Sequence, residues 1–330
     1  MTQKKNIAVL TVMKVLASLL VIYIHGANIY GYSGLAMPVY FRPFAALAKS
    51  SVPVFMAVSG YLMFRKPILW RENLIKKTRR LAVPFLIWSV VWIVFELAGH
   101  AVMLERFSDV LSWTPVQLVR AVFGIPFAAG PLYSPLWYVR ELFILSIAAP
   151  LFQKAMSRRP AVFLVLAVVV WFSPCGEHVR QSVTFFFAGG VMACSDQYLE
   201  TLRKTTLERE GVWIFLLAVV CAIPRVEMLW RLSVMAMVIF VYLLCKTAAQ
   251  KPRAQGLCDK LIAYTFIIYV THGKFLSIVQ ILYTAKFTGQ TAVNLGYLLI
   301  PALMFCVCLA VAVAFRKLLP RLYRICNGEG

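Results

Sequence analysis

Residues 13–28, MKVLASLLVIYIHGAN, form an apolar run of transmembrane character that contains two ionisable side chains, Lys14 and His25. They are eleven positions apart, almost three turns of an α-helix, so both leave nearly the same face, about 16 Å from each other. Ser18 and Asn28 lie close to that face. Ionisable groups are costly in lipid and therefore face a bundle interior or a wet cavity. The stretch predicts an inward-facing polar stripe that forms a functional site.

The composition is that of a membrane protein. Of the 330 residues, 61% are hydrophobic and only 14% charged, with a mean hydropathy of +0.78, whereas a soluble chain is about half apolar and about a quarter charged. Apolar runs long enough to cross a bilayer as helices recur from end to end. We therefore expect an all-α, polytopic integral membrane bundle that forms one domain over residues 1–330. The first helix lacks a small-residue cleavage site, so we expect it to be retained.

The apolar runs predict about ten transmembrane helices. Their expected ranges are 7–29, 43–64, 81–103, 132–152, 160–173, 180–195, 211–224, 229–247, 260–283 and 293–319. Basic residues concentrate in every second connection, which the positive-inside rule assigns to the cytoplasm. An even number of spans with both termini cytoplasmic fits this pattern. The same rule accounts for most of the net charge of +21, so we expect no nucleic-acid partner.

The longest non-cytoplasmic connection is expected at residues 104–135. Its apolar side chains are spaced so that a short interfacial helix can form. Such a segment could cover an outward cavity or simply pack against the bundle.

The sequence shows no metal-binding pattern. The eight cysteines have neither zinc-site nor CxxC spacing. No histidine and carboxylate stand at metal-binding spacing either, so we expect no metal.

The second expected helix contains SVPVFMAVSGYL, residues 51–62. Pro53 and Gly60 loosen the helical backbone, and the freed polar groups must be satisfied inside the protein. This pattern is typical either of a functional site or of a kinked span that packs through small residues.

The third expected helix is entered through a dense basic run, KKTRRLAVP, residues 76–84. Lys76, Arg79 and Arg80 could bind the phosphates of a nucleotide-like group or anionic lipid headgroups. They could equally be a topology signal alone.

The fourth expected helix carries Trp137, Arg140 and Glu141. Arg140 and Glu141 point about 100° apart, so they are not an obvious pair, and we expect each to meet a partner on another helix. Glu141 could act as an acid, a base or a counter-ion, or could form a structural salt bridge.

In the ninth expected helix, Thr265, Tyr269 and His272 recur at i, i+4 and i+7 and so share one face. Together with the preceding stretches they resemble the acyltransferase-3 family of integral-membrane O-acyltransferases. The matching motifs are Lys14 and His25 with ten residues between them, then residues 51–62, 80–84, 136–138 and 265–272.

Two positions depart from the family pattern. Lys14 stands where Arg is commoner, which loses the planar fork that grips a carboxylate or phosphate. Pro135 stands where many relatives have a His, so that residue's role cannot be carried over.

The resemblance implies transfer of an acyl group, most often acetyl, from cytoplasmic acyl-CoA to a hydroxyl of a cell-surface glycan or lipid-linked saccharide. It also implies a multi-pass location in the bacterial cytoplasmic (inner) membrane. We assign His25 to the chemistry, as a base or as an acyl-accepting nucleophile. We assign Lys14 to donor binding or to an ion pair with Glu141.

Further roles follow from the same resemblance. Lys76, Arg79 and Arg80 are expected to meet the CoA phosphates. The residues expected to contact substrate beside His25 are Tyr61, Trp137, Tyr269 and His272. Two other functions stay open: a transporter or translocase of a lipid-linked saccharide or small substrate, and a binding or regulatory protein that has kept the fold without catalysis.

Overall fold

The computed structural model describes residues 3–103, 110–125 and 131–329, and within them the chain is helical with no strand. The first half contains α1 (Gln3–Gly26), α2 (Asn28–Ser33), α3 (Arg42–Lys49), α4 (Ser51–Phe64), α5 (Trp70–Lys77), α6 (Val83–Met103), α7 (Pro115–Phe123) and α8 (Trp137–Arg158). The second half contains α9 (Pro160–Phe172), α10 (Glu177–Cys194), α11 (Asp196–Lys204), α12 (Val212–Ala222), α13 (Glu227–Ala248), α14 (Pro252–Leu261), α15 (Thr265–Lys286), α16 (Gln290–Leu318) and α17 (Pro320–Cys326). Short 3-10 or π turns are η1 (Val39–Phe41), η2 (Thr78–Ala82), η3 (Val110–Ser112), η4 (Ser134–Leu136), η5 (Leu207–Gly211) and η6 (Ile262–Tyr264).

Seven helical stretches of the described chain are long and apolar enough to cross a membrane. They are Asn6–Ser33, Val39–Phe64, Trp70–His100, Ser134–Arg158, Glu227–Ala248, Pro252–Lys286 and Gln290–Leu318. Helices also occupy the other three expected ranges, as α9, α10 and α12, but these are shorter or less apolar. The polytopic all-α fold is confirmed, whereas the count of ten and the cytoplasmic location of both termini remain predictions.

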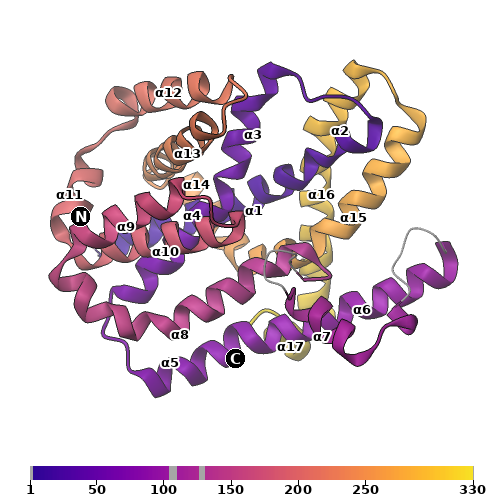
Figure 1. Cartoon of the computed structure of the whole chain (residues 1–330), viewed down its shortest axis with the longest axis horizontal. Coiled ribbons are helices and arrows are strands. Elements are labelled where there is room, and N and C mark those ends of the chain that lie inside the picture. Colours follow the sequence, from indigo (N-terminus) through magenta and orange to yellow (C-terminus); the bar gives the residue numbers. More distant parts are fainter. Residues whose placement is uncertain (1–2, 104–109, 126–130, 330) are drawn as a thin grey trace.

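Helix α1 lies inside the bundle, where α3, α4, α13, α15 and α16 pack around it (Figure 1). Its interior position follows from its sequence, because small and branched apolar residues such as Ala17 and Ile22 are fully buried. Ser18, on the predicted stripe, is also fully buried and donates to the carbonyl of Val15 at 2.7 Å. A buried hydroxyl bonded within its own helix leaves no unpaired polar group in the core.

The expected kink in the second span is a helix boundary at Ser50, between α3 and α4. Beyond it α4 packs very closely against α10. A Cβ on Gly60 would lie 1.9 Å from the carbonyl oxygen of Phe186, and one on Gly189 would lie 2.0 Å from that of Ala57. Only glycine permits backbones to approach this closely. Of the two interpretations of residues 51–62, the structure shows a span that packs against its neighbour through small residues.

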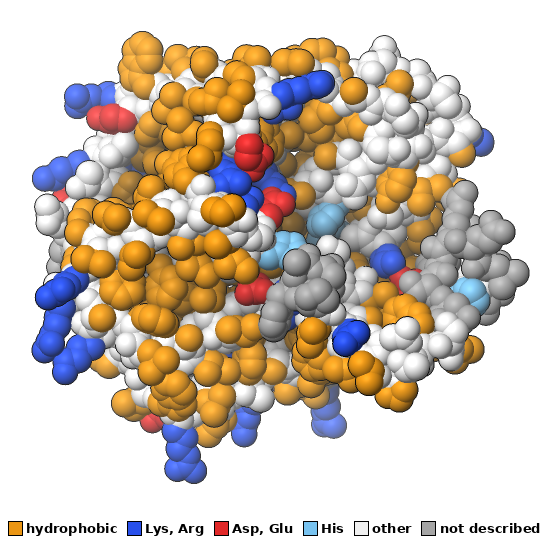
Figure 2. Space-filling view, in the orientation of Figure 1, with side chains coloured by type: hydrophobic (Ala, Val, Ile, Leu, Met, Phe, Trp, Pro, Cys, Tyr) orange, Lys and Arg blue, Asp and Glu red, His pale blue; other side chains and the backbone are white. Residues whose placement is uncertain are grey.

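Hydrophobic side chains cover much of the face in Figure 2, while Lys and Arg side chains gather along its left and lower edges. This is the distribution expected when an apolar belt meets lipid and the basic ends meet water and headgroups. Part of the expected 104–135 connection, residues 104–109 and 126–130, lies outside the described residues. Between those gaps α7 begins after a capping box formed by Thr114 and Gln117, and the placement of this segment outside the cytoplasm stays a prediction.

Candidate active site

The last turn of α1 brings His25 against His272 of α15. Their ring centroids are 5.2 Å apart and the rings are inclined by 51°. His272 is fully buried, whereas His25 is partly exposed and lines a cavity of about 480 Å³. The two histidines therefore differ in access to the cavity: His25 lines it, whereas His272 is buried next to His25 on the side away from the cavity.

The surroundings of His272 fix the role of each ring nitrogen. Nδ1 lies 3.2 Å from the carbonyl oxygen of Ile268, one turn earlier. A neutral imidazole can only donate to that oxygen, so its proton sits on Nδ1 and Nε2 carries a lone pair. Nε2 is buried and has no hydrogen-bond partner among the described residues. A buried acceptor is costly when unpaired, and the neighbouring His25 ring is the group that can supply a donor.

The backbone at His25 is held from two sides. Gln280, fully buried on α15, donates from Nε2 to the carbonyl oxygens of Gly26 at 2.6 Å and His25 at 3.4 Å. These carbonyls end α1 and would otherwise be unpaired. On the other side Gly26 packs against α16, where a Cβ would stand 2.6 Å from Cγ of Pro301. The position of His25 is therefore set by main-chain contacts as well as by its own ring.

Aromatic side chains tie the described end of the 104–135 segment to α15. The amide of Gly273 donates to the hydroxyl of Tyr133 at 2.8 Å. Tyr133 stacks on Trp92 with centroids 4.3 Å apart, and the Trp92 indole donates to the carbonyl of Val270 at 3.1 Å. Offset stacking and a bonded indole make such a wall rigid.

Tyr269 completes this wall. Its hydroxyl donates to the carbonyl of Pro135, and its ring lies 6.1 Å from that of His272. Pro135 itself lines the cavity that His25 faces. Tyr269 and His272 therefore lie next to residues that line the cavity, and their expected contact with substrate stays a prediction.

The cavity also contains an ion pair. Lys274 lines it, and its ammonium group contacts the carboxylate of Glu96 on α6. Glu96 is only 1% exposed, so its charge requires this cation. The pair therefore places the ammonium group of Lys274 on the wall of the cavity that His25 lines.

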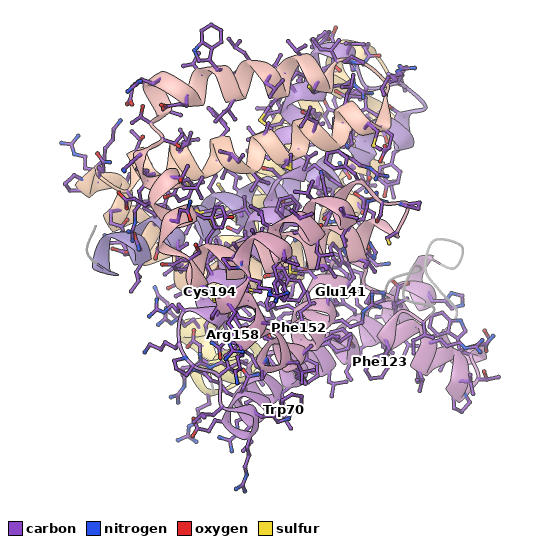
Figure 3. All side chains as sticks on the ribbon, turned by 60° about the vertical axis from the view of Figure 1, so that its left-hand side comes forward. Trp70, Phe123, Glu141, Phe152, Arg158 and Cys194 are labelled. Carbon is purple, nitrogen blue, oxygen red and sulfur yellow. The ribbon has the colours of Figure 1, made fainter. Side chains whose placement is uncertain are left out.

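The predicted ion pair between Lys14 and Glu141 is absent from the described structure. Glu141 binds Arg140 instead, with Nη2 and Oε1 2.9 Å apart, so the expectation that these neighbours do not pair is wrong. The long Arg140 side chain bends back to the carboxylate while its Nη1 donates to the carbonyls of Phe123 and Gly124 (Figure 3, where Glu141 and Phe123 are labelled). The Arg140 side chain is long and flexible enough to reach the carboxylate of Glu141, although the two side chains leave the helix about 100° apart.

Lys14 lies near the middle of α1, about three turns before His25, and belongs to a group of basic residues. Lys77 interacts electrostatically with Lys14, Lys76 and Arg80. Lys76, Arg79 and Arg80 are exposed, and no described carboxylate forms a salt bridge with Lys14. No salt bridge pairs these cations with a carboxylate among the described residues, and such a concentration of positive charge favours phosphate binding.

Two further candidates are not among the residues that line the His25 cavity. Tyr61 lines a separate apolar cavity, where Asn6 donates to its hydroxyl at 3.4 Å. Asn6 is near the start of α1 and His25 near its end, so Tyr61 is not a neighbour of His25. Trp137 stacks on His178, with centroids 4.1 Å apart. Among the described residues, no group of three or more His, Cys, Asp or Glu could hold a metal ion.

The fold and the site define a polytopic helical membrane protein with a histidine pair inside its bundle. A family model described as an acyltransferase domain, that of the acyltransferase-3 family, matches residues 7–317, and the chain belongs to this family. The expected family is confirmed, and with it the class of membrane acyltransferase.

The chain is also similar to the succinoglycan biosynthesis protein ExoH of Rhizobium meliloti (strain 1021). The two are 30% identical over 155 residues, which are 45% of this chain and 41% of the relative. The matched segment thus spans less than half the length of that protein. No solved structure matches the chain.

Sequence reasoning missed several residues of the site, above all Gln280, Tyr133 and Lys274. A glutamine in an apolar helix was a usable signal, because a buried amide must find partners. Tyr133 carried no such signal, since aromatic residues are common throughout this chain. Its role depends on which helix the 104–135 segment meets, and the pattern within that segment does not determine this.

Proposed function

We propose that the protein moves an acyl group, most simply acetyl, from cytoplasmic acyl-CoA to a hydroxyl of a cell-surface glycan or lipid-linked saccharide in the bacterial cytoplasmic membrane. The observation that carries the proposal is the position of His25, on a cavity wall and backed by a buried histidine with an unpaired Nε2. The name of the relative, which refers to succinoglycan biosynthesis, supports a saccharide acceptor.

In the proposed reaction His25 takes the proton of the acceptor hydroxyl while the hydroxyl oxygen attacks the thioester carbonyl carbon. The carbon–sulfur bond then breaks, and the CoA thiolate leaves and takes up the proton. His272 accepts the other His25 N–H at its Nε2, so that the lone pair of His25 faces the cavity. A histidine oriented in this way is suited to general-base catalysis.

A two-step route uses the same residues. His25 itself attacks the thioester carbonyl carbon, the carbon–sulfur bond breaks, and the CoA thiolate leaves while the acyl group stays on the His25 nitrogen. The acceptor hydroxyl then attacks the acyl carbon, the carbon–nitrogen bond breaks, and the thiolate takes up the hydroxyl proton. Both routes require His25 at the reacting carbon, and they differ in whether an acylated protein forms. Mass spectrometry of protein quenched after mixing with acyl-CoA alone separates them, because only the second route adds the acyl mass to the peptide that contains His25.

Lys14 has a different role in the proposal. It lies about 16 Å along α1 from His25, too far to share an atom with it, and it belongs to the basic group of Lys76 and Arg80. We assign this group to the phosphates of the donor, which enters from the cytoplasm with its thioester directed toward His25.

The test is acyl transfer from labelled acetyl-CoA by the purified protein in proteoliposomes that contain extracted surface glycan. His25→Ala should lower transfer at least ~100-fold, the scale of a general base, whereas His100→Gln, which changes a histidine outside the cavity, should not. Lys14→Ala should raise the KM for acetyl-CoA, and Lys14→Arg should restore it. Transfer that survives His25→Ala would overturn the site, and glycan transport without thioester turnover would favour a translocase.

A further inference from the structure

A second cavity, of about 340 Å³, lies on another face of the same turn of α1. Tyr23 and Ile24 of α1 and Ala27 just after it form one side of the cavity, and side chains of α3, α9, α10, α13 and α16 form the rest. Lys49 of α3 lines this cavity and interacts electrostatically with His25. The two cavities therefore flank the proposed catalytic histidine.

Cationic side chains outnumber acidic side chains in the lining of the second cavity. Three are cationic (Lys49, Arg180 and Arg231) and two are acidic (Glu177 and Glu227). The set therefore carries one uncompensated positive charge. Figure 2 shows acidic and basic side chains gathered in a hollow near the centre of this face, with histidine side chains beside them.

The burial of these groups is also unequal. The side chains of Arg180 and Arg231 are only 13% and 12% exposed, whereas that of Glu227 is 63% exposed. The cations are thus the desolvated partners, and a buried charge that lacks full compensation is costly. An anion that enters the cavity would reduce that cost.

Arg180 is the cation with the weakest compensation. Lys49 lies 2.6 Å from Glu177, and Arg231 lies 2.9 Å from Glu227. Arg180 shares Glu227 at 3.9 Å, beyond hydrogen-bond distance, although it also donates to a main-chain carbonyl. Its Nε is buried and has no hydrogen-bond partner among the described residues.

The other lining groups suit a sugar. Trp171, Trp230 and Tyr297 present aromatic surface to the cavity, and Gln181 presents an amide. Aromatic walls with a few convergent polar groups are typical of small-molecule sites, and aromatic rings pack against the C–H faces of sugar rings. A sugar with a carboxylate would use both the rings and the uncompensated charge.

We propose that this second cavity binds a carboxylate-bearing sugar unit of the acceptor, with its carboxylate at Arg180 and Lys49. The inference rests on the proposed function, since it names the acceptor class of the same site. Because Lys49 of this cavity interacts electrostatically with His25, the proposal has the adjoining unit of the saccharide extend from this cavity toward His25. The residues select acidic saccharides over neutral ones.

The test is binding to the purified full-length protein in nanodiscs, followed by quenching of tryptophan fluorescence. The probes are methyl β-D-glucuronide and its neutral counterpart, methyl β-D-glucoside. The wild type should bind the glucuronide about tenfold more tightly, the scale of one charge-assisted hydrogen bond. Arg180→Gln and Lys49→Gln should abolish the preference, Lys49→Arg should keep it, and Lys286→Gln, which changes a lysine outside the cavity, should leave it unchanged.

Equal affinity of the wild type for the two sugars, or no binding of either, would overturn the proposal. This comparison uses only the wild-type protein, so it holds even if a variant fails to fold. A glucuronide preference that persists in both glutamine variants would overturn it as well. Because binding needs no acyl donor, the two proposals fail separately. If the wild type prefers the glucuronide but transfers no acyl group, only the proposed function is rejected. If it transfers an acyl group but shows no preference for the glucuronide, only the binding of an acidic sugar in this cavity is rejected.

Discussion

At the scale of single residues, the proposed mechanism has the Nε2 lone pair of His272 orient the His25 ring, whose centroid lies 5.2 Å from that of His272. Replacing His272 with Phe keeps an aromatic ring in a fully buried position but removes both ring nitrogens. We expect kcat to fall by roughly 100-fold, because a misoriented base loses most of its contribution, while the KM values for donor and acceptor stay near wild type.

The measurement is steady-state acyl transfer in proteoliposomes. Thr284→Val is the matched control, since Thr284 is also buried on α15 but bonds only to carbonyls of its own helix. A wild-type kcat in His272→Phe would show that His25 acts without support from this ring.

The sequence predicted some of these residues and not others, for a physical reason. The spacing of Lys14 and His25, and of Tyr269 and His272, specifies a shared helix face through the 3.6-residue period. It does not specify which face of which other helix is opposite. The Lys14–Glu141 pair was therefore wrong, and Gln280, whose amide binds the end of α1, was missed.

At the scale of elements, α4 and α10 pack with their backbones in very close contact. A methyl group at Gly189 would meet the carbonyl oxygen of Ala57 at 2.0 Å, and a backbone atom cannot move aside as a flexible side chain can. We expect Gly189→Ala to force the helices apart and to cost about 1–3 kcal/mol, the scale of an overpacked core. The measurement is thermal unfolding of the purified protein in detergent.

Gly256→Ala is the control for that experiment. Gly256 lies inside α14, and a Cβ there would meet nothing within 4 Å. Alanine should leave stability unchanged or raise it slightly, because it favours the helix over glycine. Equal unfolding temperatures for Gly189→Ala and Gly256→Ala would show that α4 and α10 tolerate a wider separation.

At the scale of the whole molecule, the distribution of charge along the chain predicts which ends of the helices face the cytoplasm. The all-α bundle could be predicted because composition and run length alone distinguish membrane helices. The helices α9, α10 and α12, which are shorter or less apolar than the other seven stretches, could not be counted as spans from length and hydropathy, because these leave their depth in the bilayer undetermined. A direct measurement of sidedness resolves both points.

Two native cysteines suit that measurement. Cys175 lies between α9 and α10, in a connection predicted to be outside, and is exposed. Cys258 lies in α14, partly exposed and near basic residues predicted to be cytoplasmic. In proteins that retain only one of these cysteines, a membrane-impermeant maleimide should label Cys175 in intact spheroplasts, and Cys258 only after permeabilisation.

Labelling of Cys258 in intact spheroplasts would invert the orientation, and with it the side from which the donor reaches Lys14. Labelling of neither cysteine until permeabilisation would place α9 and α10 on the cytoplasmic side without a complete crossing, and would reduce the number of spans below ten.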